Sequence, residues 1–113
     1  MHKTTDDVNR AIESFLHALK IKGLPLDKVY LFGSQAKGAA GPESDIDLII
    51  VSSAFSDMPL WKRWEVLGDA LAEVLQPIEA LSYSPEEFTA QKNRQASFLQ
   101  HILQQPDTIE YQL

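Results

Sequence analysis

The feature that most constrains this chain is a glycine-rich segment between two short apolar runs. Residues 28–32 read KVYLF, and residues 33–44 read GSQAKGAAGPES, which holds three of the five glycines of the chain. The sequence then changes to DIDLIIVS at residues 45–52. Apolar, β-prone runs bounded by glycine are typical of strands, and a run as apolar as LIIV is typical of a buried central strand. We therefore expect two strands that are joined by a turn beginning at Gly33.

Three stretches of the chain show the three- and four-residue spacing of amphipathic helices. The first ends at Gly23, and the second covers residues 59–75. The third begins at Ser84, where a capping serine, Pro85 and a glutamate three residues after the cap form a strong start signal. We expect this third helix to continue through a polar middle and to close at Pro106.

Two further segments predict strands and complete the fold. Residues 78–83 (IEALSY) predict a third strand, and the alternating tail at residues 108–113 (TIEYQL) predicts a fourth strand at the edge. The element order indicates an α/β (α+β) fold, with a small mixed β-sheet of roughly three to five strands and helices mainly on one face. At this length we expect a single domain covering residues 1–113.

The composition excludes several classes of protein. Ten Lys and Arg stand against 16 Asp and Glu, so the net charge is −6, and the chain has no cysteine. An acidic balance argues against a protein that coats duplex nucleic acid, and the lack of cysteine excludes disulfides and thiolate sites. No apolar stretch is long enough to predict a membrane span. We expect a soluble cytoplasmic protein.

Three acidic residues stand at the starts of two predicted strands. Asp45 and Asp47 alternate along one strand, so their side chains project from the same face. Two carboxylates that close repel each other unless a divalent cation lies between them, and oxygen ligands suit Mg²⁺. Glu79, isolated between apolar Ile78 and Ala80, supplies a third acid. The sequence thus predicts a metal site.

An anion-binding turn precedes these acids. Gly33 and Ser34 follow a predicted strand, where backbone N–H groups and a hydroxyl can bind a phosphate. Taken alone, this pair also suits an ordinary turn, the Asp45 and Asp47 pair a solvated strand start, and Glu79 an exposed edge. Their joint spacing favours a site for phosphoryl or nucleotidyl transfer from a metal–nucleoside triphosphate.

The combined motif resembles a known family. Phe32-Gly33-Ser34, ten residues, Asp45-Ile46-Asp47-Leu48 and a later Ile78-Glu79-Ala80 are similar to the signature of the polymerase β-like nucleotidyltransferase superfamily. The whole run GSQAKGAAGPESDIDLIIV resembles the minimal nucleotidyltransferase (MNT) branch, whose small proteins are often encoded beside a helical HEPN-domain partner. The resemblance implies the polymerase β-like nucleotidyltransferase fold.

The same resemblance implies roles for individual residues. Gly33 and Ser34 would bind the β- and γ-phosphates of ATP, the substrate, and Lys37 would add positive charge there. Two Mg²⁺ ions would be held by the catalytic acids, which are Asp45, Asp47 and Glu79. Many members of the superfamily carry Asp at the third acidic position, where this chain has Glu79.

The resemblance also implies a partner and an acceptor. We expect transfer of AMP from ATP to a hydroxyl of a partner protein, with the chain acting as the antitoxin of a HEPN toxin pair. The acceptor pocket would come from that helical HEPN-type partner or from a homodimer. Two alternatives stay open: a non-catalytic binding partner that neutralises the toxin, and a catalytic subunit that nucleotidylates a small molecule. Trp61 and Trp64, three residues apart on a predicted helix, favour packing in the core or against a partner over base stacking.

Overall fold

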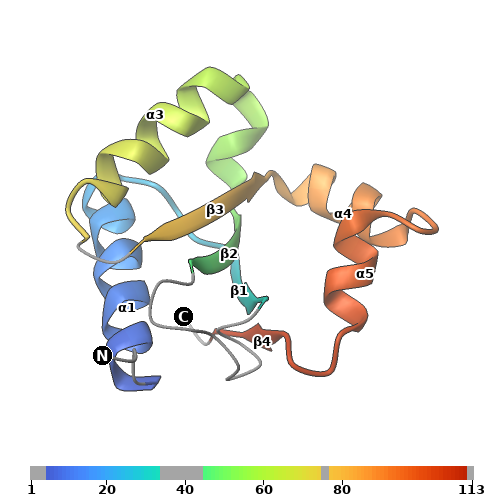
Figure 1. Cartoon of the computed structure of the whole chain (residues 1–113). Helices are drawn as coiled ribbons and strands as arrows, with labels where there is room; N and C mark the ends of the chain where they lie inside the picture. The colour runs from blue at the N-terminus through green and yellow to red at the C-terminus, as the bar shows by residue number, and fades with distance from the viewer. Residues whose placement is uncertain (1–4, 34–44, 75–76, 112–113) are drawn as a thin grey trace.

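The computed structural model describes residues 5–33, 45–74 and 77–111, and its elements are labelled in Figure 1. In chain order they are α1 (Thr5–Ile21), β1 (Lys28–Phe32), β2 (Ile46–Val51), the 3-10 helix η1 (Ser53–Asp57), α3 (Leu60–Leu71), β3 (Ile78–Tyr83), α4 (Pro85–Asn93), α5 (Phe98–Gln104) and β4 (Ile109–Glu110). The predicted mixed α/β fold is confirmed. The short 3-10 helix η1 was not predicted.

The four strands form one mixed sheet in the order β3-β2-β1-β4. Strand β1 pairs antiparallel with both β2 and β4, whereas β2 pairs parallel with β3. Strand β2 is therefore central and β3 lies at an edge. The central position of β2 agrees with its burial, since every residue of β2 except Asp47 is buried. The tail was predicted to form an edge strand, and it does so as β4, next to β1.

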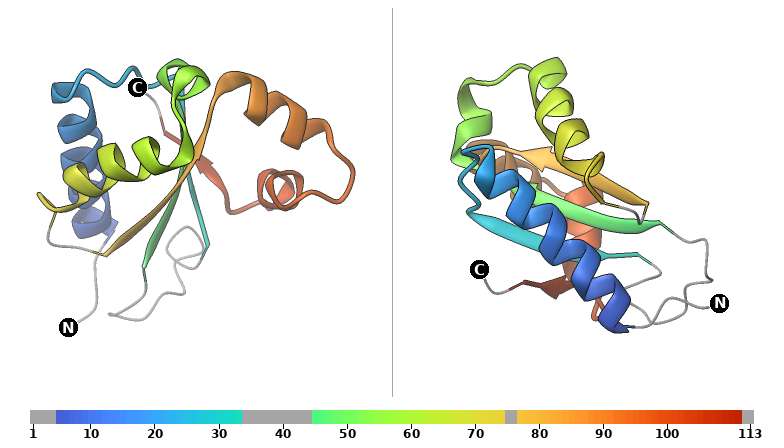
Figure 2. Two further views of the ribbon diagram at one scale, coloured as in Figure 1. Left: turned by 90° about the horizontal axis from the view of Figure 1, so that it is seen from above. Right: turned by 90° about the vertical axis from the view of Figure 1, so that its left-hand side faces the viewer.

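Helices cover both faces of this sheet, as the two views in Figure 2 show. The longer helices α1 and α3 pack on one face, over Val29, Leu31, Leu48 and Ile50. The shorter helices α4 and α5 pack on the opposite face, where one member of the cluster is Ile49. The expectation that helices lie mainly on one face therefore describes α1 and α3, and the last two helices supply a smaller second layer.

The stretch predicted as one helix from Ser84 to Pro106 is two helices, so that prediction is wrong. The break falls between α4 and α5, where Ala96 has a φ of 61°. The polar run QKNRQ offers no apolar side chain that would hold a continuing helix against the sheet. Ser97 then starts the new helix, because its hydroxyl accepts a hydrogen bond from the Gln100 N–H at 3.0 Å.

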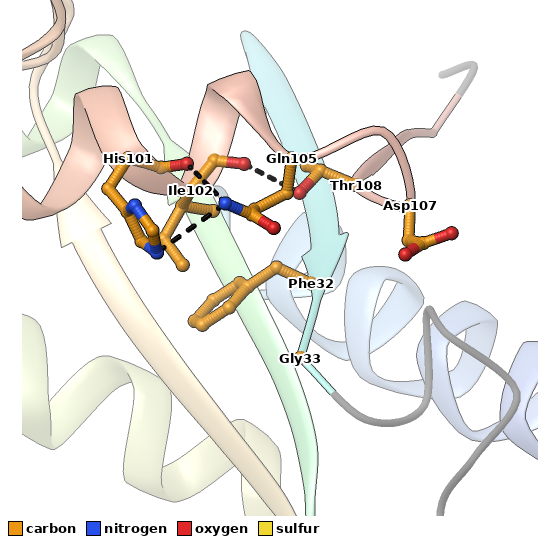
Figure 3. A pocket seen from close by; sticks show the side chains of 7 residues that line it. All are labelled: Phe32, Gly33, His101, Ile102, Gln105, Asp107 and Thr108. Atoms are coloured by element: carbon orange, nitrogen blue, oxygen red, sulfur yellow. Dashed lines mark hydrogen bonds between the residues drawn. The ribbon is translucent and has the colours of Figure 1, made fainter.

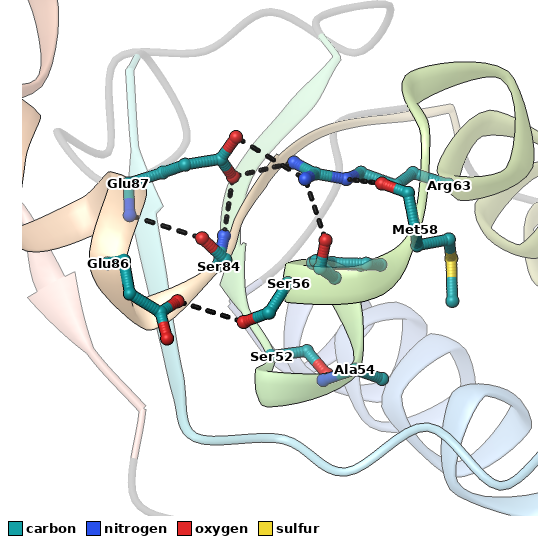
Figure 4. A network of polar contacts seen from close by, with 9 residues as sticks. Ser52, Ala54, Ser56, Met58, Arg63, Ser84, Glu86 and Glu87 are labelled. Carbon is teal, nitrogen blue, oxygen red and sulfur yellow. Dashed lines mark hydrogen bonds and ion pairs between the residues drawn. The ribbon is translucent and has the colours of Figure 1, made fainter.

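A polar network fixes α3 and α4 against η1 (Figure 4). The guanidinium of Arg63, which is 6% exposed, donates to the carbonyl oxygens of Met58 at 3.0 Å and Phe55 at 2.7 Å. It also forms an ion pair of 2.7 Å with Glu87. Glu87 accepts from the backbone N–H of Ser84 at 2.8 Å, which closes the predicted capping box of α4. A buried cation is tolerated here because its donors are satisfied.

None of the helices in the described part of the chain is long and apolar enough to cross a membrane.

Candidate active site

The candidate site lies at the end of the sheet where β1 ends and where β2 and β3 begin. The strand register places Asp47 opposite Phe32 on β1 and opposite Glu79 on β3. Neighbouring strands lie about 5 Å apart, so residues in register are direct neighbours on one face of the sheet. The ladder therefore brings together an acid from the central strand and an acid from the edge strand, which lie 32 residues apart in the sequence.

Strand alternation decides which face carries these acids. On β2, Leu48 and Ile50 belong to the core under α1 and α3, whereas Ile49 and Val51 belong to the core under α4 and α5. Because side chains alternate along a strand, Asp47 projects to the same side as Ile49. The acidic row thus lies on the α4 and α5 face of the sheet.

Burial and neighbouring acids perturb Asp47. The pKa of Asp47 is raised from its ordinary value of 3.8 to about 6, first by burial, then by a hydrogen bond with Glu79, and then by the charges of Glu79 and Asp45. Glu79 and Asp45 are therefore each close enough to act on Asp47. A divalent cation relieves such repulsion, and carboxylate oxygens are the donors that Mg²⁺ prefers. The chemistry of this donor set fits the predicted metal.

Gly33, which follows β1, lies against the carboxylate of Asp47. Its φ is 77°, a left-handed conformation that favours glycine. A Cβ atom at this position would collide with the Asp47 carboxylate and would lie 3.3 Å from its Cγ. Glycine is therefore required twice over, by the backbone conformation and by the close approach of the carboxylate.

Two predicted site residues, Ser34 and Lys37, lie outside the described residues. Within residues 5–33, 45–74 and 77–111, no group of three or more His, Cys, Asp or Glu side chains is arranged as a metal-binding cluster. Asp47 and Glu79 are paired, and Asp45 acts on Asp47 through its charge. The roles assigned to these acids and to Gly33 stay predictions.

A small pocket of about 100 Å³ opens beside Gly33 (Figure 3). It is lined by Phe32, Gly33, His101, Ile102, Gln105, Asp107 and Thr108. The side-chain amide of Gln105 lies 3.5 Å from His101 Nε2. Sequence reasoning missed the polar residues of α5 and its following turn, because only the packing of α5 on the sheet brings residues 101–108 to the end of β1. No spacing in the sequence signals that contact.

The chain was compared with known families and proteins. The family described as nucleotidyltransferase domain matches residues 12–107, which is most of the chain. No curated protein matches.

Three solved structures are similar to this chain. A candidate nucleotidyltransferase from Sulfolobus solfataricus is 22% identical with a TM-score of 0.53, over 89% of this chain and 85% of that one. A toxin–antitoxin structure with AMP-PNP is 28% identical with a TM-score of 0.43, over 62% of this chain and 56% of that one. The BolA domain of SufE1 from Arabidopsis thaliana is 25% identical with a TM-score of 0.44, over 69% and 94%. The first of these likenesses supports the fold.

Proposed function

This chain belongs to the nucleotidyltransferase domain family and is a nucleotidyltransferase, and we propose that it transfers AMP from ATP to a hydroxyl of a partner protein with the help of Mg²⁺. The proposal depends on one arrangement: Asp47 and Glu79 are neighbours on adjacent strands, and Gly33 lies against the Asp47 carboxylate. An acidic row next to a glycine turn suits a metal-bound triphosphate.

The proposed reaction is a displacement at the α-phosphorus of ATP. The acceptor hydroxyl oxygen attacks that phosphorus, and a new oxygen–phosphorus bond forms. The bond to the oxygen that bridges to the β-phosphate breaks, and pyrophosphate leaves. Glu79, which is exposed beside Asp47, takes the hydroxyl proton.

The chain's own residues would bind and orient the nucleotide. Asp45, Asp47 and Glu79 would hold two Mg²⁺ ions, whose charge, when bound, neutralises the phosphates and the leaving pyrophosphate. At Gly33 the missing side chain leaves the backbone accessible to an anion. Ser34 would donate its hydroxyl to the β- and γ-phosphates, and Lys37 would add positive charge.

The proposed acceptor belongs to a helical HEPN-type protein, with this chain as its antitoxin. The support is the resemblance of residues 33–51 to the MNT branch. The test incubates the full chain with ATP labelled at the α-phosphate, Mg²⁺ and the protein encoded beside it. We expect label on the neighbour with the wild-type chain and none with Asp47→Ala.

Each other outcome of this test identifies a different function. Equal labelling by Asp47→Ala would contradict the proposed site. Neutralisation of the neighbour without labelling, retained in the double variant Asp45→Ala and Asp47→Ala, would identify a non-catalytic binding protein. Transfer only to small hydroxylated molecules would identify the small-molecule alternative.

A further inference from the structure

Helix α3 exposes three large apolar side chains together. Leu60 is 56% exposed, Trp61 is 64% exposed and Trp64 is 65% exposed. These three residues are called the tryptophan face below. The buried residues of α3 are Arg63, Leu67 and Ala70, so Leu60, Trp61 and Trp64 are not part of the core. The two exposed tryptophans together present roughly 300 Å² of apolar surface, a patch of the size that often forms a binding site.

The exposed surface of α3 divides into two strips. Positions three and four apart share one side of a helix, so Trp61 and Trp64 continue into exposed Gly68. The neighbouring strip is acidic: it holds exposed Asp69, and exposed Glu73 follows in the turn just after α3.

Among the described residues, few positive charges neutralise the carboxylates of this acidic strip. The basic residue on it, Lys62, is already paired with Glu65 at 3.2 Å. A second ion pair, between Arg63 and Glu87, lies on a different side of the helix. The acidic strip is therefore available to the basic side chains of another molecule.

We propose that the tryptophan face is the docking surface for an amphipathic helix of another protein, one that carries an apolar stripe flanked by Lys and Arg. The apolar stripe would cover Trp61 and Trp64, and the basic flank would meet Asp69 and Glu73. Tryptophan is the residue type most often found at the energetic centre of such interfaces, and opposite charges at the rim orient the partner.

A second copy of the chain fits this surface poorly. A second copy would bring the same acidic residues, Asp69 and Glu73, and no basic flank to meet them, so the two copies would repel each other. The net charge of −6 adds to this repulsion.

The docking surface is separate from the acidic row. Helix α3 covers one face of the sheet, and Asp47 projects from the other. The inference therefore does not rest on the proposed function, and its test needs no nucleotide.

The chain supplies its own probe, because Trp61 and Trp64 are its two tryptophans. The full chain is titrated with a synthetic helical peptide that carries a leucine stripe flanked by lysines, and with a matched peptide in which glutamates replace the lysines. We expect the lysine peptide to shift the tryptophan emission to shorter wavelength and the glutamate peptide to bind at least about tenfold more weakly. Trp64→Ser should reduce binding, whereas Phe98→Ser, a similarly exposed position on α5, should not.

A charge exchange guards against effects of misfolding. The double variant Asp69→Lys and Glu73→Lys should lose affinity for the lysine peptide and gain affinity for the glutamate peptide, which an unfolded chain cannot do. Absence of binding by the lysine peptide, or equal binding of the two peptides, overturns the proposal. Sedimentation showing that the wild-type chain dimerises through these tryptophans would also overturn it, because the occupant would then be a second copy.

Discussion

Asp47 on β2 and Glu79 on β3 are direct neighbours across a parallel strand pair, and their carboxyl groups share a hydrogen bond. Two acids can share a hydrogen bond only when one of them holds a proton. The sheet register thus creates a local charge conflict in the protein alone, and this conflict has measurable consequences for stability.

Replacing Asp47 with Asn should stabilise the metal-free protein at neutral pH while it abolishes transfer. The pKa of Asp47 is raised from 3.8 to about 6, so its charged form is less favourable in the folded state than in the unfolded state. The cost is absent below about pH 4, grows as the pH rises, and is complete above about pH 6. After allowance for solvent screening of this half-exposed group, we expect about 1 kcal/mol.

The measurement is thermal unfolding of wild type and Asp47→Asn with a metal chelator present, across pH 3.5 to 8 in roughly half-unit steps. The melting temperatures should converge at the acidic end. A constant difference across the range would mean that titration of Asp47 is not the cause.

Gly33→Ala should destabilise the protein more than Gly23→Ala. Both glycines have positive φ, 77° and 85°, so both substitutions strain the backbone by roughly 1 kcal/mol. A new Cβ meets nothing within 4 Å at Gly23, but it collides with Asp47 at Gly33. We expect the collision to add about 1 to 3 kcal/mol, measured by denaturant unfolding.

Combining Gly33→Ala with Asp47→Ala separates the two contributions. The double variant lacks the colliding carboxylate, so the cost of Gly33→Ala in that background should fall to that of Gly23→Ala. Strict additivity of the two substitutions would show that the glycine and the carboxylate are not in contact.

Glu87→Gln should destabilise the protein at neutral pH by about 1 kcal/mol, an amount limited by the partial exposure of the carboxylate. The Arg63 guanidinium is the main cause that holds the pKa of Glu87 below its ordinary value of 4.5. Burial acts in the opposite direction, and the hydrogen bond from the Ser84 N–H lowers the pKa further. The stabilisation is therefore present above about pH 4.5 and is lost as the pH falls through the lowered pKa.

Chemical denaturation of Glu87→Gln at pH 7 and pH 3 tests this expectation. The matched control is Glu65→Gln, which removes the exposed ion pair with Lys62 and should change stability by under about 0.5 kcal/mol. Equal losses for both variants would contradict a special role for the Arg63 network.

Phe88→Ala should cost about 3 kcal/mol or more. Phe88 is 4% exposed and stacks on Tyr30, with ring centroids 5.7 Å apart. Phe98→Ala, at a position that is 56% exposed, should cost far less, although Phe98 contacts Phe32 edge to face. Denaturant unfolding of the two variants provides the comparison, and similar losses would contradict the second core under α4 and α5.

The sequence predicted the strands well because each carries a strong local signal. The apolar run of β2 and the glycine after β1 depend only on neighbouring residues. The capping box at Ser84 is likewise local, and it starts α4 as expected. The break before α5 was missed because the helical spacing of Phe88 and Leu99 continues across it, and the left-handed Ala96 has no warning in its residue type.

The sequence predicted the pairing of the acids less well than it predicted the strands. Alternation indicated that Asp45 and Asp47 share a face, and the position of Glu79 at a strand start suggested a third acid. That β3 pairs parallel with β2 in the register Asp47 to Glu79 is a property of the assembled sheet. The pocket beside Gly33 depends on the placement of α5, which no local pattern encodes.

Strand β2 pairs antiparallel with β1, which ends one residue before Gly33, and parallel with β3, which carries Glu79. The row is therefore held by backbone ladders, and the lengths of the segments that connect the strands do not set it. The same geometry makes these three strands a portable unit, which protein engineers can graft with its acids already aligned.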